Sequence, residues 1–430
     1  MAETATATEK AQKAAIDNVS YADLYKRWEN GHWKATDLDF TEDRAYWHET
    51  FSDLERRAAL WNYSMFFHGE DSVTDNLSPY IDAAPLEEQK YFLATQQVDE
   101  ARHAVFFSRF MQEVVDRGDS IGSSLAATQP ELSWGFRKTF AHLDKVADGL
   151  RKDRSLPNFA AAITMYHLLV EATLAQPGQH FIEGYLVERG ILPGFRAGME
   201  NVSRDEQRHI GFGVKCLSDL VKQDPECKYA VADLIREVMP FMTAVFVPPN
   251  WDRRYTEVFG STIEEVYESG MTSLEQKLKT AGLPLEELPG APPIPYDLSA
   301  RERAERGIAL LQAGYIGEKL GPPNRDPENV AMLFDLIKRS VDTSLTPASG
   351  ATIQWEFRDA EPWFMRIDNG STSTEQGRLE NADVVLKCRF EDWVDIVGGR
   401  EDPRLAMAKG KLRPKGNIRL LLKMSKLFGR

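Results

Sequence analysis

The sequence contains very little cysteine and no cysteine pair of the kind that binds zinc or forms a redox centre. Only three cysteines occur in 430 residues, at the widely separated positions Cys216, Cys227 and Cys388. This scarcity argues against a disulfide-stabilised or cysteine-ligated fold. We therefore expect the protein to work in a reducing compartment, the cytoplasm.

Uninterrupted apolar segments long enough to cross a membrane are also missing. The longest apolar run, residues 159–175, contains Tyr166, His167 and Glu171, which a transmembrane helix would bury in lipid. The first 13 residues have neither a basic start nor an apolar stretch, so they do not form a signal peptide. We expect a buried helix at 159–175 and a disordered tail at 1–20.

Positive charge is in deficit, since 66 acidic residues outnumber 52 basic ones and the net charge is −14. Nucleic-acid binding needs a broad basic surface, so nucleic acid is excluded as a general partner. A hydrophobic content of 42% is that of a globular protein, and the length suggests two domains.

The first domain, expected at 21–320, has helical periodicity. Apolar residues recur at spacings of three and four, and Pro or Gly clusters separate the segments. The long connection at 118–156 carries a further helix near 134–150. The four main helices are predicted at 46–74, 86–115, 158–188 and 195–222. Two helix pairs joined by one long crossover form a ferritin-like all-α bundle.

A small α+β domain is expected at 329–430, after a linker at 321–328 that begins Gly321-Pro322-Pro323. Here apolar residues alternate with polar ones, as strands with one buried face require. The alternating segments are centred on Trp355, Met365 and Leu386. Helices are predicted at 330–340 and 417–427.

The pentapeptide Asp-Glu-x-Arg-His occurs twice, at 99–103 and 205–209. Residues three apart lie on one face of a helix, so Glu100 with His103, and Glu206 with His209, can each bind one metal ion. A single Glu-x-x-His pair is weak evidence. The repeated pentapeptide predicts a two-metal site.

Ions of the iron and manganese type prefer shells rich in oxygen, so each half-site needs a further carboxylate. Glu70 precedes Glu100 by 30 residues, and Glu171 precedes Glu206 by 35. Glu183 is an alternative to Glu171, but Glu171 lies in the most apolar segment, where an unpaired carboxylate is costly. We therefore predict Glu70 and Glu171 as the remaining ligands.

Other polar residues near these positions have two interpretations. His68 and His167 can be extra ligands, although a lone histidine beside a carboxylate more often supports a ligand or fills the core. Both pentapeptides also contain an acid and an arginine that either orient the ligands or form surface ion pairs. These residues are Asp99, Arg102, Asp205 and Arg208.

With these motifs, residues 47–320 resemble the ribonucleotide-reductase-small-subunit-like ligand-binding oxidases. The similarity lies in segment 69–74, in both pentapeptides, and in Ile210-Gly211-Phe212-Gly213 after the second. It implies a manganese/iron centre, with two irons as the alternative, that activates oxygen beside a ligand of the long-chain fatty-acid type.

The resemblance also implies an ether crosslink between Val73 and Tyr166. Val73 lies one turn after Glu70 on the same helix face. Tyr166 lies five residues before Glu171, about 140° away on a regular α-helix, so contact requires the long phenol or a helix irregularity. Otherwise Tyr166 is simply a core residue. Phe107 stands where true reductase subunits carry a radical tyrosine, which disfavours radical storage.

The C-terminal domain resembles sterol-carrier-protein-type lipid-binding modules in the segments 383–388, 390–393 and 410–416. Such modules enclose an apolar tunnel, and aromatic residues here can line a tunnel or form core: Trp355, Phe357, Trp363, Phe364 and Trp393. Residues 409–430 contain eight basic residues and no acid. They can contact anionic groups, or form a solvated helix that balances an acidic protein.

We therefore expect an enzyme, an oxygen-dependent di-metal oxidase or monooxygenase of a fatty-acyl or other lipid substrate presented by the second domain. The alternative is a lipid carrier whose metal site is structural or only forms the Val73–Tyr166 crosslink. The expected partners are a hydrophobic ligand, an electron-donor protein and a second copy of the chain, with at most peripheral membrane contact.

Overall fold

The computed structural model describes residues 19–368 and 370–429. The predicted tail at 1–20 therefore falls outside the described residues, apart from its last two positions. Ser20 caps the first described helix, α2 (Tyr21–Asn30). No helix in the described part of the chain combines the length and apolar character needed to cross a bilayer.

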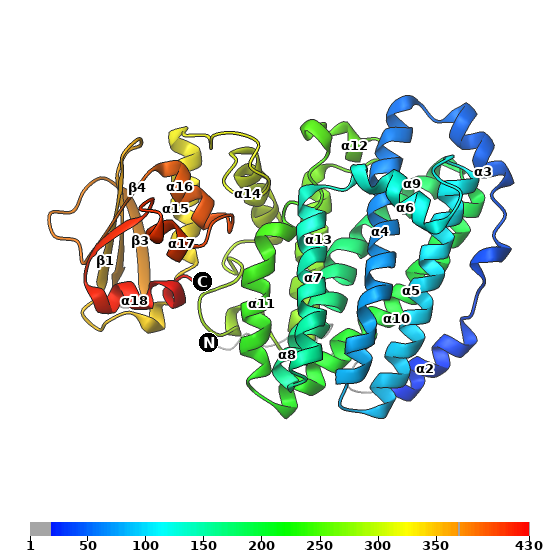
Figure 1. Cartoon of the computed structure of the whole chain (residues 1–430), viewed down its shortest axis with the longest axis horizontal. Helices are drawn as coiled ribbons and strands as arrows, with labels where there is room; N and C mark the ends of the chain where they lie inside the picture. Colours follow the sequence, from blue (N-terminus) through cyan, green and yellow to red (C-terminus); the bar gives the residue numbers. More distant parts are fainter. Residues whose placement is uncertain (1–18, 369, 430) are drawn as a thin grey trace. The chain divides into compact units, whose positions relative to one another are not determined.

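Four long helical segments form a bundle (Figure 1). They are α4 (Asp53–Ala83), α5 (Glu87–Glu113), the continuous run of α8 (Leu156–Ile163), η4 (Thr164–Ala175) and α9 (Gln176–Arg189), and α10 (Pro193–Gln223). Short loops join α4 to α5 and α9 to α10, and a long crossover joins α5 to α8. The ferritin-like bundle predicted from the sequence is confirmed.

Packing brings the two helix pairs together. α4 contacts α5, and α10 contacts α5, α8, η4 and α9. The crossover contains α6 (Ile121–Thr128), η3 (Gln129–Glu131) and α7 (Trp134–Lys152), of which α7 packs on α4. The surrounding segments are η1 (Ala35–Asp37), α3 (Thr41–Ala45), η2 (Tyr46–Thr50), η5 (Pro249–Trp251), α12 (Arg254–Glu257) and α13 (Ile263–Thr280). Along the chain, α11 (Cys227–Met242) follows α10.

The first long helix begins and ends later than its sequence pattern suggests. Phe51 is extended, and Ser52 forms a capping box with Glu55 that starts α4 at Asp53 instead of residue 46. The helix then continues through Pro79 to Ala83. The region 46–50 is a separate π-helical turn, η2.

The C-terminal sheet has five strands in the order β3-β2-β1-β4-β5. β1 pairs with β4 in parallel, and the other pairs are antiparallel. The strands are β1 (Ala351–Phe357), β2 (Trp363–Asp368), β3 (Ser371–Gln376), β4 (Val384–Cys388) and β5 (Arg413–Gly416). The helices of this region are α15 (Pro327–Arg339), α16 (Phe390–Val397), α17 (Pro403–Ala408) and α18 (Ile418–Leu427), with the short turn η7 (Thr343–Leu345). The predicted α+β fold is confirmed.

Aromatic side chains fill the space between this sheet and its helices. Phe334 of α15 stacks on Trp363 with ring centroids 4.5 Å apart, and Trp355 contacts Trp393 at 5.4 Å. Trp355, Phe357, Trp363 and Trp393 all belong to the buried core. The structure thus places these four among the core residues of the domain.

By its internal contacts the chain divides into two units. The first comprises 19–231 with Val245–Pro284, and the second comprises Ala232–Ala244 with 285–429. The second unit therefore also contains η6 (Leu285–Glu287) and α14 (Ala300–Gln312). The linker at 321–328 stays a prediction.

Candidate metal centre

Six predicted residues meet inside the helical bundle. Each of the four long segments contributes at least one of them, and all six side chains are buried. Their potential ligand atoms form two overlapping groups, within each of which the atoms lie no more than 4.8 Å apart. The groups are Glu70, Glu100, His103 and Glu206, and Glu100, Glu171, Glu206 and His209. Glu100 and Glu206 occur in both groups, as carboxylates that bridge two ions would.

The two imidazoles both turn Nδ1 toward the carboxylates. His103 Nδ1 lies 3.2 Å from Glu70 Oε2 and 3.4 Å from Glu100 Oε2. His209 Nδ1 lies 3.1 Å from Glu100 Oε1 and 3.4 Å from Glu171 Oε1. The three-residue spacing of each motif on α5 and α10 explains why Glu and His share a face.

Several buried atoms of this cluster lack a hydrogen-bond partner. They are Glu171 Oε2, Glu206 Oε2 and His209 Nδ1. Unsatisfied polar atoms are rare in protein interiors, and these three are all electron-pair donors in a group of carboxylates. The donor set therefore fits two oxygen-preferring metal ions.

The electrostatics lead to the same conclusion. Burial raises the pKa of Glu171 well above its ordinary value, and the charge of Glu206 raises it further. Burial acts in the same direction on Glu100, but His209 and His103 outweigh it and hold the pKa of Glu100 well below the usual range. Four glutamates in one buried cluster need compensating positive charge, which protons or metal ions can supply.

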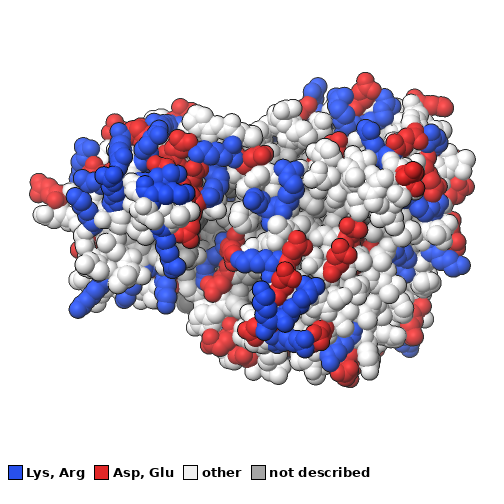
Figure 2. All heavy atoms as spheres, viewed as in Figure 1, with Lys and Arg blue, Asp and Glu red and all other residues white. Residues whose placement is uncertain are grey.

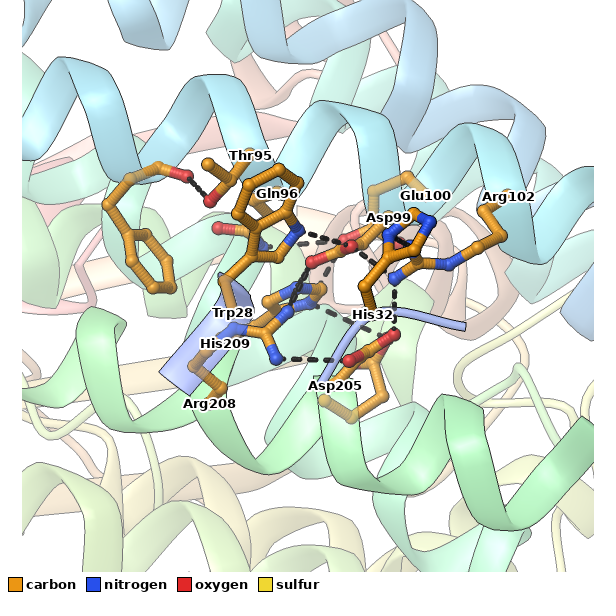
Figure 3. Close-up of polar contacts among 12 residues, drawn as sticks. Trp28, His32, Thr95, Gln96, Asp99, Glu100, Arg102, Asp205, Arg208 and His209 are labelled. Carbon is orange, nitrogen blue, oxygen red and sulfur yellow. Dashed lines mark hydrogen bonds and ion pairs between the residues drawn. The ribbon is translucent and has the colours of Figure 1, made fainter. Parts of the chain in front are cut away.

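Behind the imidazoles, the acids and arginines of the two motifs form a buried tetrad (Figure 3). Arg102 bonds to Asp99 and, at 2.9 Å, to Asp205. Arg208 bonds to Asp99 and, at 3.0 Å, to Asp205. None of the four side chains is more than 8% exposed, so surface ion pairing is excluded for these residues, and two acids and two arginines balance in charge.

Each histidine takes its outer partner from the opposite helix. His103 Nε2 lies 3.2 Å from Asp205 Oδ2, and His209 Nε2 lies 3.1 Å from Asp99 Oδ2. A carboxylate on Nε2 fixes the ring so that Nδ1 faces the cluster. This exchange between α5 and α10 explains why the whole pentapeptide is repeated, and not only its Glu and His.

Sequence reasoning missed two tryptophans that complete this layer. Trp28 of α2 donates its indole N–H to Asp99 Oδ1 at 2.9 Å, and Trp33 donates to Asp205 Oδ2 at 2.8 Å. They lie 71 and 172 residues from their partners, so no local spacing connects them. The only feature of the sequence that could have pointed to these residues is that two tryptophans lie close together in the chain before the first helix pair.

Gln96 was also missed, although it lies one turn before Glu100. Its amide donates to Glu171 Oε1 at 2.8 Å, and its Oε1 lies 3.0 Å from Nε2 of His167. Burial lowers the pKa of His167 to about 3, so this imidazole is neutral. His167 thus reaches Glu171 through Gln96 and belongs to neither ligand group.

The remaining alternatives lie outside both ligand groups. His68 Nε2 lies 3.0 Å from Thr128 Oγ1. Glu183 of α9 accepts a hydrogen bond from Ser203. Neither side chain is part of the cluster.

A mainly apolar cavity opens beside the cluster. Four of the six residues line it, together with Val73 and Tyr166. The rest of its wall is almost entirely apolar: Met65, Phe66, Gly69, Phe136, Phe140, Val170, Leu174, Ala175, Val245 and Phe246, with Asn62 as the polar exception. A pocket with this lining suits a hydrocarbon chain.

Tyr166 reaches the cluster because η4 is π-helical. In a π-helix the hydrogen bonds run from i to i+5, so residues five apart, such as Tyr166 and Glu171, come close to one face. The phenol is 1% exposed and donates a hydrogen bond to Glu100 Oε1. The sequence left open whether the length of the phenol or a helix irregularity brings Tyr166 to the cluster, and the structure contains the helix irregularity.

The helical region matches a known protein family. The model for the ribonucleotide reductase small chain matches residues 13–243, more than half of the sequence. The chain belongs to this family. Phe107, which the sequence resemblance placed at the position of the radical tyrosine, is fully buried and stacks on Phe66.

Solved structures with this fold include R2-like ligand-binding oxidases. A glycine-to-phenylalanine mutant with an anaerobically reconstituted Mn/Fe cofactor is 23% identical, with TM-score 0.52, and the match covers 61% of this chain and 94% of that one. The oxidase from Sulfolobus acidocaldarius is 23% identical, with TM-score 0.51, over 63% and 94% of the two chains. At this identity the likeness shows the fold.

The C-terminal region has a separate match. The SCP-2 sterol transfer family model covers residues 333–429, which include α18 and the strands β1 to β5. This member of the small-chain family therefore also carries an SCP-2 domain.

Proposed function

We propose that the helical bundle is an oxygen-activating di-metal oxidase of a hydrophobic ligand. Two overlapping groups of buried carboxylates and imidazoles beside an apolar cavity carry this conclusion. The ions are held by Glu70, Glu100, His103, Glu171, Glu206 and His209. When bound, two ions of this type supply the binding and reduction of molecular oxygen needed to attack an unactivated C–H bond.

The cofactor is Mn/Fe, with Fe/Fe as the alternative. Structures with the same fold contain a reconstituted Mn/Fe cofactor. Four carboxylates and two imidazoles suit either metal pair.

The residues of the chain confine this chemistry. Glu100 and Glu206 would contribute to both ions, and the Asp–Arg tetrad keeps the imidazoles aligned without adding net charge. Apolar side chains such as Phe66, Phe140 and Val170 exclude water and hold a hydrocarbon chain against the cluster.

The substrate is a long-chain fatty acid or a related lipid. Support comes from the apolar cavity and from the SCP-2 domain on the same chain. A lipid captured by that domain is available to the bundle at high effective concentration. The protein works as a cytoplasmic homodimer and draws electrons from a donor protein.

Metal loading tests the oxidase. We expect two ions per chain after reconstitution with Mn²⁺ and Fe²⁺, and oxygen consumption that rises when a long-chain fatty acid is added. Glu206→Ala removes a shared ligand and abolishes both. Glu183→Ala, outside the cluster, is the matched control. A wild-type protein that binds neither metal rules out the proposal.

A second candidate is a lipid carrier in which oxygen only forms an internal crosslink. The observation that favours it is the presence of Val73 and Tyr166 in the wall of one cavity. An ether between Val73 Cβ and the Tyr166 oxygen removes two hydrogen atoms, which oxygen accepts. Intact-mass measurement before and after aerobic metal loading detects this loss, and Tyr166→Phe prevents it. Crosslinking without fatty-acid-dependent oxygen consumption favours the carrier.

A further inference from the structure

Helix α18 exposes two large apolar side chains one turn apart. Ile418 is 71% exposed and Leu422 is 78% exposed, which places both among the most exposed large hydrophobic residues described. Residues at i and i+4 lie on one helix face. Neither side chain is covered by another part of the described chain.

The same face carries four exposed cations. Lys415 lies just before α18, and Arg419, Lys423 and Lys426 lie within it. None of the four forms an ion pair with another described residue. The earlier lysines of this basic segment differ, because Lys409 and Lys411 both bind Glu401.

The opposite face anchors the helix in the domain. Leu420 and Leu427 are buried in the core formed with the sheet, and Met424 packs against that core. The exposed face is thus presented in a fixed orientation by a folded support. Figure 2 shows many Lys and Arg side chains over the unit that carries α18.

We propose that this face, Lys415, Ile418, Arg419, Leu422, Lys423 and Lys426, docks on a lipid bilayer with anionic headgroups. The cations meet the headgroups, and the two apolar side chains enter the boundary between headgroups and acyl chains. The helix lies in the plane of the interface, about 15 Å long. Docking brings the SCP-2 domain to a source of lipid, whatever chemistry the bundle performs.

Two other occupants fit the face less well. A second copy of α18 would bring like charges together, because each copy contributes four unpaired cations. A soluble polyanion would bind the cations but leave Ile418 and Leu422 in water. An anionic bilayer satisfies both parts of the face.

Vesicle flotation with the full-length protein tests this assignment. We expect binding to vesicles of phosphatidylcholine mixed with phosphatidylglycerol, little binding to phosphatidylcholine alone, and weakening by salt. Because each cation near such a surface contributes about fivefold, Arg419→Ala with Lys423→Ala lowers partitioning about 25-fold. Ile418→Ser with Leu422→Ser weakens binding while leaving the charge unchanged.

The matched control removes two exposed cations from the sheet, by Lys387→Ala with Arg366→Ala. Each lies between buried neighbours along its strand, so its side chain points away from the core. This variant should bind like the wild type.

The proposal is overturned if the wild type does not bind anionic vesicles or if the α18 charge variant binds equally well. Loss with the charge variant but not with the serine variant also overturns it, because the face then contacts the headgroups through charge alone and the two apolar side chains do not enter the bilayer. Circular dichroism and thermal unfolding confirm that each variant is folded.

Discussion

Each imidazole of the cluster is oriented by an aspartate from the other motif. Asp205 faces Nε2 of His103, and Asp99 faces Nε2 of His209. Both aspartates also accept an indole N–H and bonds from arginine, so their own orientation is fixed on several sides. We infer that metal affinity depends on these aspartates although neither belongs to the ligand groups.

Asp205→Asn tests this dependence. We expect affinity for the ion next to His103 to fall about 10- to 100-fold, because the ring loses its carboxylate partner. Titration against a competing chelator measures the change.

The matched control is Asp219→Asn. Asp219 lies on the same helix and also binds an aromatic residue from the N-terminal region, Tyr21, but it is remote from the cluster. An Asp205→Asn affinity within twofold of the control would contradict the orienting role.

At the scale of elements, α10 approaches η4 closely enough to require glycine. A Cβ on Gly213 would lie 2.2 Å from Cβ of His167, whereas a Cβ on Gly211 would meet nothing within 4 Å. This contact sets the distance between the helices that carry Glu206 and Glu171. Gly213 therefore fixes the spacing of the cluster through backbone approach.

Gly213→Ala should destabilise the protein by about 1–3 kcal/mol, because the added methyl group forces the two helices apart. Gly211→Ala should be neutral or stabilise by up to about 1 kcal/mol, since alanine favours a helix more than glycine does. Urea unfolding compares the two variants. Equal stability of both would show that α10 shifts freely against η4.

Glu55 joins the start of α4 to the end of α9. It accepts bonds from the backbone of Ser52 at 2.7 Å, from Tyr185 at 2.8 Å and from Arg189 at 3.0 Å. Burial alone would raise the pKa of Glu55, but these donors outweigh it and lower the pKa to about 2 from an ordinary 4.5. The resulting stabilisation is present above pH 4.5 and is lost as the pH falls toward 2.

Glu55→Gln should therefore cost up to about 3 kcal/mol near pH 7, and the difference from the wild type should narrow by more than half near pH 3. Urea unfolding at both pH values provides the measurement. Asp53→Asn, in the same helical turn but largely exposed, should show neither effect. A cost that does not change with pH would assign Glu55 a packing role only.

The sequence predicted those elements whose burial pattern is regular. α5 and α10 appear within two residues of their expected bounds, and the apolar alternation located β1, β2 and β4. β3 and β5 were missed because they are largely exposed strands at the sheet edges, so no apolar alternation marks them. The sequence offered a helix irregularity only as one of two ways for Tyr166 to reach the cluster. It could not select the π-helical form of η4, because packing rather than local sequence determines that form.

In the candidate site, too, some residues could be predicted from the sequence and others could not. The motif spacing led to Glu100, His103, Glu206 and His209, since i and i+3 geometry is local, and the need for further carboxylates led to Glu70 and Glu171. Trp28, Trp33 and Gln96 were missed because they join the site through contacts between distant helices. No periodicity within one segment contains that information.

On the scale of the whole molecule, the cluster concentrates four acidic residues where three segments of the bundle converge on α5. Without metal ions, protons on the two histidines must compensate the negative charge. Burial lowers the pKa of His103 and His209, but the neighbouring carboxylates outweigh it and raise both pKa values well above the ordinary value. Two divalent ions would compensate four carboxylates and would join α4, α5, η4 and α10 through the proposed shared ligands. Metal should therefore act as a clamp on the bundle.

We expect metal binding to slow hydrogen exchange in the four ligand-bearing segments. At free metal 100 times the dissociation constant, stabilisation is about 2.7 kcal/mol, so amides that exchange only on unfolding of the bundle should slow by up to about 100-fold. Peptides from β1 to β5 hold no ligand and provide the internal comparison. Glu206→Ala should abolish the protection, because it removes a carboxylate common to both groups, whereas Glu183→Ala should retain it. Equal protection in Glu206→Ala would mean that the metal binds elsewhere on the chain, and the clamp would have to be abandoned.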